Sequence, residues 1–286
     1  MTTRSAVGTV APVRSSRVPA ALRRPPVGLV LAWLVIAVVV VWAVAPGLFT
    51  EYDPVNGVPA QKLQAPGAQH LFGTDALGRD VFARVVHGSA RSLSGAVVAV
   101  AVGLTVGTLL GLVAGSVGGV LDEVVMRVVD VLLAVPGLLL ALTVIILLGP
   151  GTINVAIAVG VGSIAAFARL ARSEVVRVRR ADYVEAAFGS GGRFTTVLWR
   201  HVLPNSVGPV VALAAVQFGA AILAISTLSF LGYGAKPPEP EWGLLIAEGR
   251  NYLATSWWLT TLPGVVVMLV VLATSRISRS INREDR

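Results

Sequence analysis

LSGAVVAVAVGLTVGTLLGLVAGS, from Leu93 to Ser116, runs for 24 residues without a charged side chain. A helix needs roughly 20 mostly apolar residues to cross about 30 Å of hydrocarbon. The stretch therefore predicts a membrane-spanning helix. The whole chain has a similar character, because 55% of its 286 residues are hydrophobic, only 13% are charged, and its mean hydropathy is +0.79. This composition excludes an ordinary soluble domain.

Five further segments have the length and apolar character of spanning helices. The six expected spans are Val27 to Ala45, Leu93 to Ser116, Val124 to Leu148, Asn154 to Ala171, Val207 to Leu231 and Trp258 to Thr274. The sequence thus predicts an all-α membrane protein with six transmembrane helices. The first apolar run is longer than that of a signal peptide, and no small-residue cleavage site follows it, so we expect it to be retained.

The distribution of positive charge predicts the orientation. Of the 23 Lys and Arg residues, 17 lie in the N-terminal tail, in the segments after the second and fourth spans, and after the sixth span, whereas six lie on the opposite side. Cytoplasmic loops of membrane proteins are enriched in these residues. Both termini are therefore expected in the cytoplasm. The same distribution explains the net charge of +8 without nucleic acid, because the basic residues form no aromatic-studded stripe.

These spans divide the chain into regions. Residues 1–26 form a predicted cytoplasmic tail, and residues 27–91 form the first span with an extracytoplasmic segment. Residues 92–280 form the membrane core, which includes a cytoplasmic loop at 172–205, and residues 281–286 form a second cytoplasmic tail.

The second span repeats a small residue at every fourth position. Its members are Gly95, Ala99, Gly103, Gly107, Gly111, Gly115 and Gly119. On a helix they form one smooth ridge, which lets a second helix approach closely in lipid. The ridge serves either packing within one bundle or a surface that slides or seals between subunits. Pro136 with Gly137, and Pro263 with Gly264, predict kinks in the third and sixth spans.

The sequence contains no recognisable catalytic constellation. Cysteine is absent, the G-x-S-x-G pattern of serine hydrolases is missing, and His70, His87 and His201 lie in different loops, two outside and one inside, so they cannot share a metal. Lys62 and Lys236 do not follow glycine, so no phosphate-binding loop of the G-x-x-x-x-G-K-[ST] type exists. We expect no enzyme activity and no cofactor on this chain, and any ATP-driven transport requires a separate ATPase.

Asp130 is the one acidic residue inside an expected span. Arg127 lies three residues earlier on the same helix face, so a local ion pair near the lipid headgroups is one interpretation. Contact with a partner subunit or a gate is the other, because charge within a membrane is usually retained for function.

The segment DYVEAAFGSGGRFTTVLWRHVLPN, Asp182 to Asn205, predicts a docking element. Tyr183, Ala186, Ala187 and Phe188 offer a compact apolar edge beside Glu185, which suits a groove on a soluble partner. Gly191 and Gly192 permit a sharp reversal. Arg193 to Leu203 is then expected to form a second short helix that Pro204 ends before the fifth span. The alternative is an ordinary solvated basic loop.

This segment resembles the EAA loop of importer-type ABC transporter permeases. Glu185-Ala186-Ala187 is followed by Gly191 and by His201-Val202-Leu203-Pro204 at the family's spacing. Three further stretches resemble the C-type permease of the dipeptide/oligopeptide and nickel branch. They are His70 to Asp75 with Leu77 to Asp80, Leu228 to Gly232 with Pro237 to Gly243, and Trp257-Trp258 with Pro263-Gly264.

The resemblance implies a type I importer fold in the cytoplasmic (inner) membrane. It implies a homologous B-type permease, one or two nucleotide-binding ATPase subunits that use ATP and Mg, and an extracytoplasmic binding protein that docks on segments 51–91 and 232–257. Glu185, Gly191, His201 and Pro204 take the ATPase-coupling role by position.

The substrate and the class of transporter have alternatives. A short peptide is the expected substrate, while the same branch also imports nickel complexes and other small solutes. A stand-alone secondary transporter or channel would carry mid-membrane carboxylates, discontinuous helices in both halves or an internal repeat. None of these is clear in the sequence.

Overall fold

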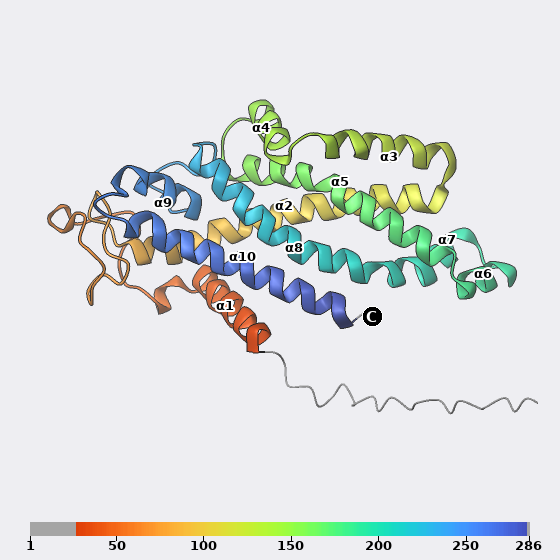
Figure 1. The fold of residues 1–286 in the computed structure, drawn as a ribbon, viewed down its shortest axis with the longest axis horizontal. Helices are drawn as coiled ribbons and strands as arrows, with labels where there is room; N and C mark the ends of the chain where they lie inside the picture. Colours follow the sequence, from red (N-terminus) through yellow and green to blue (C-terminus); the bar gives the residue numbers. More distant parts are fainter. Residues whose placement is uncertain (1–26, 285–286) are drawn as a thin grey trace, which may run out of the picture.

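Long helices running side by side make up most of the molecule. The computed structural model describes residues 27–284, and the predicted tail 1–26 therefore lies outside the described residues. Five of the helices in these residues are long and apolar, and in Figure 1 all but the first run roughly lengthwise along the molecule. They are α1 (Val27–Val44), α2 (Val81–Val117), α5 (Thr152–Arg179), α8 (Leu203–Phe230) and α10 (Trp258–Glu284). All five are long and apolar enough to cross a membrane, which confirms the prediction of an all-α membrane protein.

The third predicted span is broken rather than kinked. The region forms α3 (Gly119–Ala134) and α4 (Gly137–Leu148), whose axes differ by 98°. Val135 and Pro136 adopt extended backbone between them, because the proline ring disfavours helical geometry at the residue before it. The six expected spans are thus five long helices and one bent pair. A sequence can locate this break at Pro136, but the angle depends on what the two halves pack against.

Several helices are longer than the apolar runs that predicted them. α2 begins at Val81 instead of Leu93, because the Asp80 carboxylate accepts a hydrogen bond from the Ala83 backbone amide at 2.6 Å and caps the helix. α5 continues to Arg179, so residues 172–179 of the expected loop are helical. α10 runs through Glu284, past the expected end of the span at Thr274 and into the expected tail. Polar turns extend these helices because helix propensity does not require apolar residues.

The core lies where α2, α5, α8 and α10 meet. Alanine, valine and isoleucine side chains fill it, among them Ala99, Val155, Ile222 and Val270, all of which are almost fully buried. α2 and α5 form the most extensive pair. α1 packs on α10, where Ala32 contacts Ala273 and Ile277. The start of α1 therefore lies beside the end of α10.

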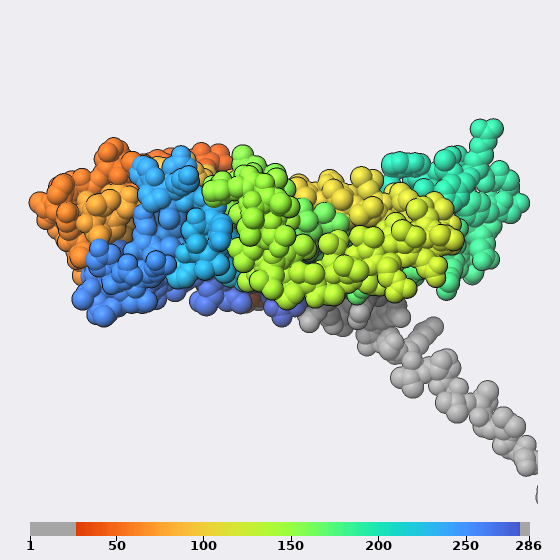
Figure 2. Space-filling model, turned by 90° about the horizontal axis from the view of Figure 1, so that it is seen from above, coloured from red at the N-terminus to blue at the C-terminus, as the bar shows by residue number. Residues whose placement is uncertain are grey.

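Short elements gather at the two opposite ends of the bundle. At one end, called here the α6 end, lie α6 (Asp182–Gly189) and α7 (Phe194–Val197). At the other, the α9 end, lie residues 45–80 with the short helical turns Pro46–Leu48 and Pro59–Gln61, and α9 (Trp242–Gly249) followed by the turn Arg250–Tyr252. Figure 2 shows how far apart these two groups are, with the lengths of the helices between them.

Candidate functional site

The α6 end is built around a tight reversal. α6 ends at Gly189, and Gly191 follows with a φ of +84°, a left-handed conformation that glycine adopts without strain. The Gly192 amide then donates to the Ala187 carbonyl at 3.0 Å, and a Cβ at Gly192 would lie 2.6 Å from that same oxygen. The two glycines thus turn the chain and let it return directly beneath α6.

The second short helix of the prediction is wrong in one respect, because it does not end at Pro204. Helical structure runs without a break from Phe194 to Phe230, through α7, a π-helical turn at Leu198–Val202, and α8. Proline lacks an N–H, and its ring would strike the carbonyl of Arg200 in a regular α-helix. The wider turn, in which the Leu203 amide donates to the Leu198 carbonyl, makes room for Pro204. The docking element is therefore continuous with a long membrane helix.

The predicted coupling residues lie on the surface of this end. Tyr183, Glu185, Ala186, Phe188, Gly191 and Pro204 are exposed, whereas Ala187 and His201 are half-buried. The Tyr183 and Phe188 side chains are 48% and 38% exposed. Large aromatic side chains are usually more buried than this, and α6 is too short to cross a membrane and expose them to lipid. The Glu185 carboxylate forms no ion pair with residues 27–280, whose side chains the structure describes. The helix α6 thus offers an apolar edge and a free negative charge.

The opposite face of α6 is anchored. Val184 is fully buried and packs with Val175 and Val178 from the end of α5 and with Val197 and Val202 from the following helix. Half-buried residues of this cluster include Ala187 and Leu112, the latter from α2. The exposed surface therefore stands on a packed base that contacts three membrane helices.

Two aromatic residues of this surface escape the sequence prediction. Phe194 and Trp199 are 44% and 66% exposed on the returning helix. In the sequence, each of these aromatic residues stands next to an arginine, Arg193 or Arg200, in a segment expected to be in water. An aromatic residue in such a segment is a signal of surface exposure. We define the coupling surface as the exposed residues of this end, namely Tyr183, Glu185, Phe188, Phe194 and Trp199.

The glycine ridge of α2 faces α5. A Cβ at Gly103 would lie 1.9 Å from the Ser163 hydroxyl, and a Cβ at Gly107 would lie 2.5 Å from the Ile164 carbonyl. A Cβ added at Gly111 or Gly115 would lie 2.3 or 3.0 Å, respectively, from a backbone carbonyl oxygen of α5. Gly119 is not part of the ridge, because Gly118 turns the chain with a φ of +74° and α2 has ended at Val117. The ridge thus brings two backbones into direct contact along most of α2.

An arginine also joins the two helices at the α6 end. The Arg179 guanidinium donates from Nη1 to the carbonyls of Gly115 at 2.9 Å and Ser116 at 2.6 Å. These are among the last carbonyls of α2, which have no partners within the helix. A positive charge at a helix C-terminus is also favourable for the helix dipole.

Asp130 does not pair with Arg127. Its carboxylate accepts a hydrogen bond from Arg169 on α5. Asp122, two turns earlier on α3, binds the Arg172 guanidinium through both oxygens, at 3.0 and 2.6 Å. The expected local pair is wrong because α3 lies against α5 (Figure 1), which brings two arginines of α5 within reach. Two ion pairs therefore hold the otherwise largely exposed helix α3.

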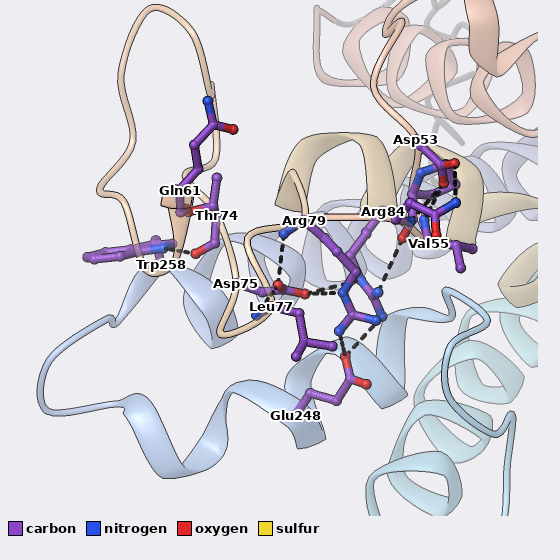
Figure 3. Close-up of polar contacts among 12 residues, drawn as sticks. Asp53, Val55, Gln61, Thr74, Asp75, Leu77, Arg79, Arg84, Glu248 and Trp258 are labelled. Atoms are coloured by element: carbon purple, nitrogen blue, oxygen red, sulfur yellow. Dashed lines mark hydrogen bonds and ion pairs between the residues drawn. The ribbon is translucent and has the colours of Figure 1, made fainter. Parts of the chain in front are cut away.

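A network of hydrogen bonds and ion pairs joins α9 to the residues around the start of α2 at the α9 end (Figure 3). Arg84 is fully buried, and its guanidinium donates to Glu248 at 2.9 Å and to the Pro54 carbonyl at 3.2 Å. Arg79 binds the Asp75 carboxylate at 2.6 Å and reaches the same oxygen of Glu248 at 3.3 Å. Glu248 on α9 thus receives hydrogen bonds from two arginines that lie more than 160 residues earlier.

Two further contacts connect this end to the bundle. The Trp258 indole N–H at the start of α10 donates to the Thr74 carbonyl at 3.3 Å (Figure 3). His70 Nδ1 lies 2.8 Å from the Asp80 carboxylate that caps α2. The stretches from His70 to Asp80 that carried the resemblance therefore serve as a packed cap on the helices.

Glu241 begins α9 inside the protein. Its two carboxylate oxygens accept from the amides of Gly243 and Leu244, each at 3.0 Å, and the Ser92 hydroxyl donates at 3.3 Å. Complete burial raises the pKa of this carboxyl above its ordinary value, although the hydrogen bonds oppose that effect. The adjoining Trp242 is also buried and donates to the Val85 carbonyl at 3.0 Å. α9 is therefore locked to α2.

Comparison with known proteins identifies a family over most of the bundle. Residues 107–284 match the model of the binding-protein-dependent transport system inner membrane component. The dipeptide transport system permease protein of Alkalihalophilus pseudofirmus is 37% identical over 87% of this chain and 82% of that protein. The glutathione transport system permease protein of Salmonella typhimurium is 44% identical over 88% of this chain and 83% of that protein.

Two solved structures share the fold at low sequence identity. A chain of an amino acid ABC transporter with histidines matches with a TM-score of 0.56 and 14% identity, over 70% of this chain and 94% of that one. A chain of the MetNI methionine ABC transporter in inward-facing conformations matches with a TM-score of 0.54 and 16% identity, over 69% of this chain and 96% of that one. The helices thus have the arrangement of ABC importer permeases.

Proposed function

Because the chain belongs to the family of binding-protein-dependent transport system inner membrane components, we propose that it forms one half of an ATP-driven import pathway for short peptides. The relatives that transport dipeptides and glutathione support a peptide substrate, since glutathione is itself a tripeptide. A homologous B-type permease supplies the other half of the pathway. An extracytoplasmic binding protein delivers the substrate to the α9 end.

The observation that carries this proposal is the coupling surface. It exposes aromatic side chains and an unpaired carboxylate on a short helix, a combination that suits a groove on a soluble partner. The proposed partner is a nucleotide-binding ATPase subunit, one copy on this chain and a second on the other permease. ATP and Mg then belong to the ATPases, and this chain holds no cofactor. His201 and Pro204 lie beside this surface and shape the helix beneath it.

The structure offers a direct mechanical route for such coupling. Motion of α6 passes through Val184 to Val175 and Val178 of α5. α5 contacts α2 through the glycine ridge and through Arg179. Because packed backbones cannot separate without loss of contact, α2 and α5 move as one body. ATP-driven closure of the ATPases thus tilts this pair and switches the pathway between inward-facing and outward-facing states.

A charge reversal at Glu185 tests the coupling role. The carboxylate lies in the first turn of α6, where the helix dipole favours negative charge by about 0.3 to 1 kcal/mol. Glu185→Lys reverses this interaction and any pairing with a basic residue of the ATPase. We expect normal membrane insertion, loss of peptide uptake by the reconstituted transporter, and easier dissociation of the ATPase on washing.

The matched control is Glu123→Lys. Glu123 is an exposed carboxylate on α3, a helix that contributes no residue to the coupling surface. This variant should retain uptake and ATPase binding. Normal uptake by Glu185→Lys, with its ATPase firmly bound, would show that α6 is not the coupling element.

A further inference from the structure

A cavity of about 210 Å³ lies among four helices near the middle of the bundle. Its walls come from α2, α4, α5 and α8, and they include Gly137, at the break in the third span. Complete ligand sites usually measure about 300 to 1,000 Å³. A smaller, open cavity fits one side of a site that a second subunit completes.

Small side chains make this cavity possible. Alanine and glycine form most of the wall, including Ala99 on α2, Ala141 on α4, Gly162 on α5 and Ala220 on α8. A bulkier side chain at any of these positions would fill the space. The ridge glycine Gly103 contributes indirectly, because its missing side chain leaves the position that the Ser163 hydroxyl occupies next to it.

Gln217 is the main polar group in the wall. It lies near the midpoint of α8 and lines the cavity. On the same helix, Ser206 and Thr227 donate to the carbonyls one turn earlier, each at 2.8 Å. The half-buried Gln217 amide, in contrast, forms no hydrogen bond with residues 27–280, whose side chains the structure describes. An amide at this depth in a membrane is unfavourable unless something binds it.

Ser163 supplies a second polar atom to the wall. Its hydroxyl donates to the Gly160 carbonyl at 2.8 Å, so an oxygen lone pair is left to accept a hydrogen bond. No charged residue lines the cavity. A ligand held here must therefore be recognised through neutral hydrogen-bonding groups and small apolar contacts.

We propose that this cavity is a substrate contact point within the pathway, where the Gln217 amide holds a peptide group of the passing substrate. A carboxamide presents one acceptor oxygen and two donor hydrogens, which match the N–H and C=O of a peptide bond. Such a contact reads the backbone and ignores side-chain charge. This inference rests on the proposed peptide-import function, and it assigns that function a residue.

The test introduces charge at Gln217 in the complete transporter, reconstituted with its partner permease, ATPases and binding protein. Uptake of Ala-Ala-Ala, Ala-Lys-Ala and Ala-Glu-Ala is measured for Gln217→Glu and Gln217→Arg, and each preference is divided by that of the wild type. This ratio removes the selectivity of the binding protein. Arginine stays charged at any working pH, so the two variants bracket the effect.

We expect Gln217→Glu to favour Ala-Lys-Ala and Gln217→Arg to favour Ala-Glu-Ala, each by about tenfold, the effect of one charged hydrogen bond. Thr227→Glu is the matched control, because Thr227 lies on the exposed side of the same helix, outside the cavity. It should leave the preference unchanged. A merely structural role for Gln217 would lower uptake of all three peptides equally, and that result overturns the proposal.

A second measurement covers variants that fail to assemble. The chain has no cysteine, so Gln217→Cys carries a single thiol. Ala-Ala-Ala with its binding protein should slow modification of this thiol by a small methanethiosulfonate reagent, and an unchanged rate contradicts the proposal. If the wild-type transporter imports no peptide at all, the proposed function fails instead, and the peptide assigned to the cavity fails with it.

Discussion

The two ends of the molecule treat polar side chains in opposite ways. At the α9 end, Arg84 and Glu241 are fully buried, and both form hydrogen bonds within the chain. At the α6 end, Glu185 and Trp199 are exposed and lie on a single short segment. The first arrangement fixes a shape, whereas the second leaves charged and aromatic side chains on the surface, as the proposed coupling role requires.

This difference separates residues that stabilise the fold from residues that remain exposed for the proposed contact. Buried charges stabilise only when they are paired and hydrogen-bonded, so the α9 end loses stability if one member is removed. Exposed aromatic residues contribute little to folding but much to binding. Substitutions at the two ends should therefore separate stability from assembly.

The largest expected effect concerns which side of the membrane each end faces. Thr196 at the α6 end and Glu239 at the α9 end are both exposed. In the cysteine-free chain, an impermeant thiol reagent on intact cells should label Glu239→Cys and spare Thr196→Cys. Permeabilised cells should label both. Equal labelling in intact cells would contradict the orientation inferred from the arginine distribution.

Removal of the carboxylate closest to a buried arginine should destabilise the α9 end. Glu248→Ala leaves the buried Arg84 with only the more distant Asp75 carboxylate, at 3.9 Å, and breaking a buried pair costs about 3 to 5 kcal/mol. The melting temperature of the purified subunit in detergent should fall markedly. The exposed pair between Arg91 and Glu239, at 3.0 Å, offers the control, because Arg91→Ala should change stability by less than about 1 kcal/mol. Equal effects of the two substitutions would refute the distinction.

The glycine ridge should tolerate no side chain. A Cβ at Gly107 would lie 2.5 Å from the Ile164 carbonyl, so Gly107→Ala must push α2 and α5 apart, at a cost of about 1 to 3 kcal/mol. Gly264→Ala on α10 is the control, because nothing lies within 4 Å of its added Cβ. Thermal unfolding and uptake should both suffer in the first variant only. Wild-type stability of Gly107→Ala would argue against close packing there.

Trp199→Ala should leave stability unchanged and weaken assembly. The indole is 66% exposed, so its removal takes little area out of the folded chain. Truncation of an aromatic residue at the centre of an interface weakens binding by about tenfold or more. ATPase binding, measured by titration onto the reconstituted permease pair, should fall accordingly. Normal affinity would place Trp199 outside the contact, for instance in the lipid headgroup region.

Much of this architecture could be predicted from sequence patterns. The apolar runs locate the long helices, the glycines at every fourth position mark a close helix contact, and Gly191 with Gly192 marks the reversal after α6. The spacing from Glu185 to Pro204 also indicates the family that the comparisons confirm. Each of these signals is local, since one turn, one face or one span of helix is enough to produce it.

Other features depend on contacts between distant residues. Asp130 has an arginine three residues earlier but pairs with Arg169 across two helices. The arginine beside Trp199 is a local sign of an aqueous segment, but which side of the returning helix faces water depends on how that helix lies in the bundle. The cavity beside Gln217 likewise requires four helices in position.

The amino-acid sequence by itself determined the long apolar helices and the reversal after α6, because hydrophobicity, glycine and proline act through nearby atoms. Only the tertiary structure determined the 98° angle between α3 and α4, the ion-pair partners of the buried arginines, and the position of Gln217 in the wall of a cavity. The physical reason is that ion pairs, cavities and bend angles are properties of the space between elements. That space exists only once the helices have packed.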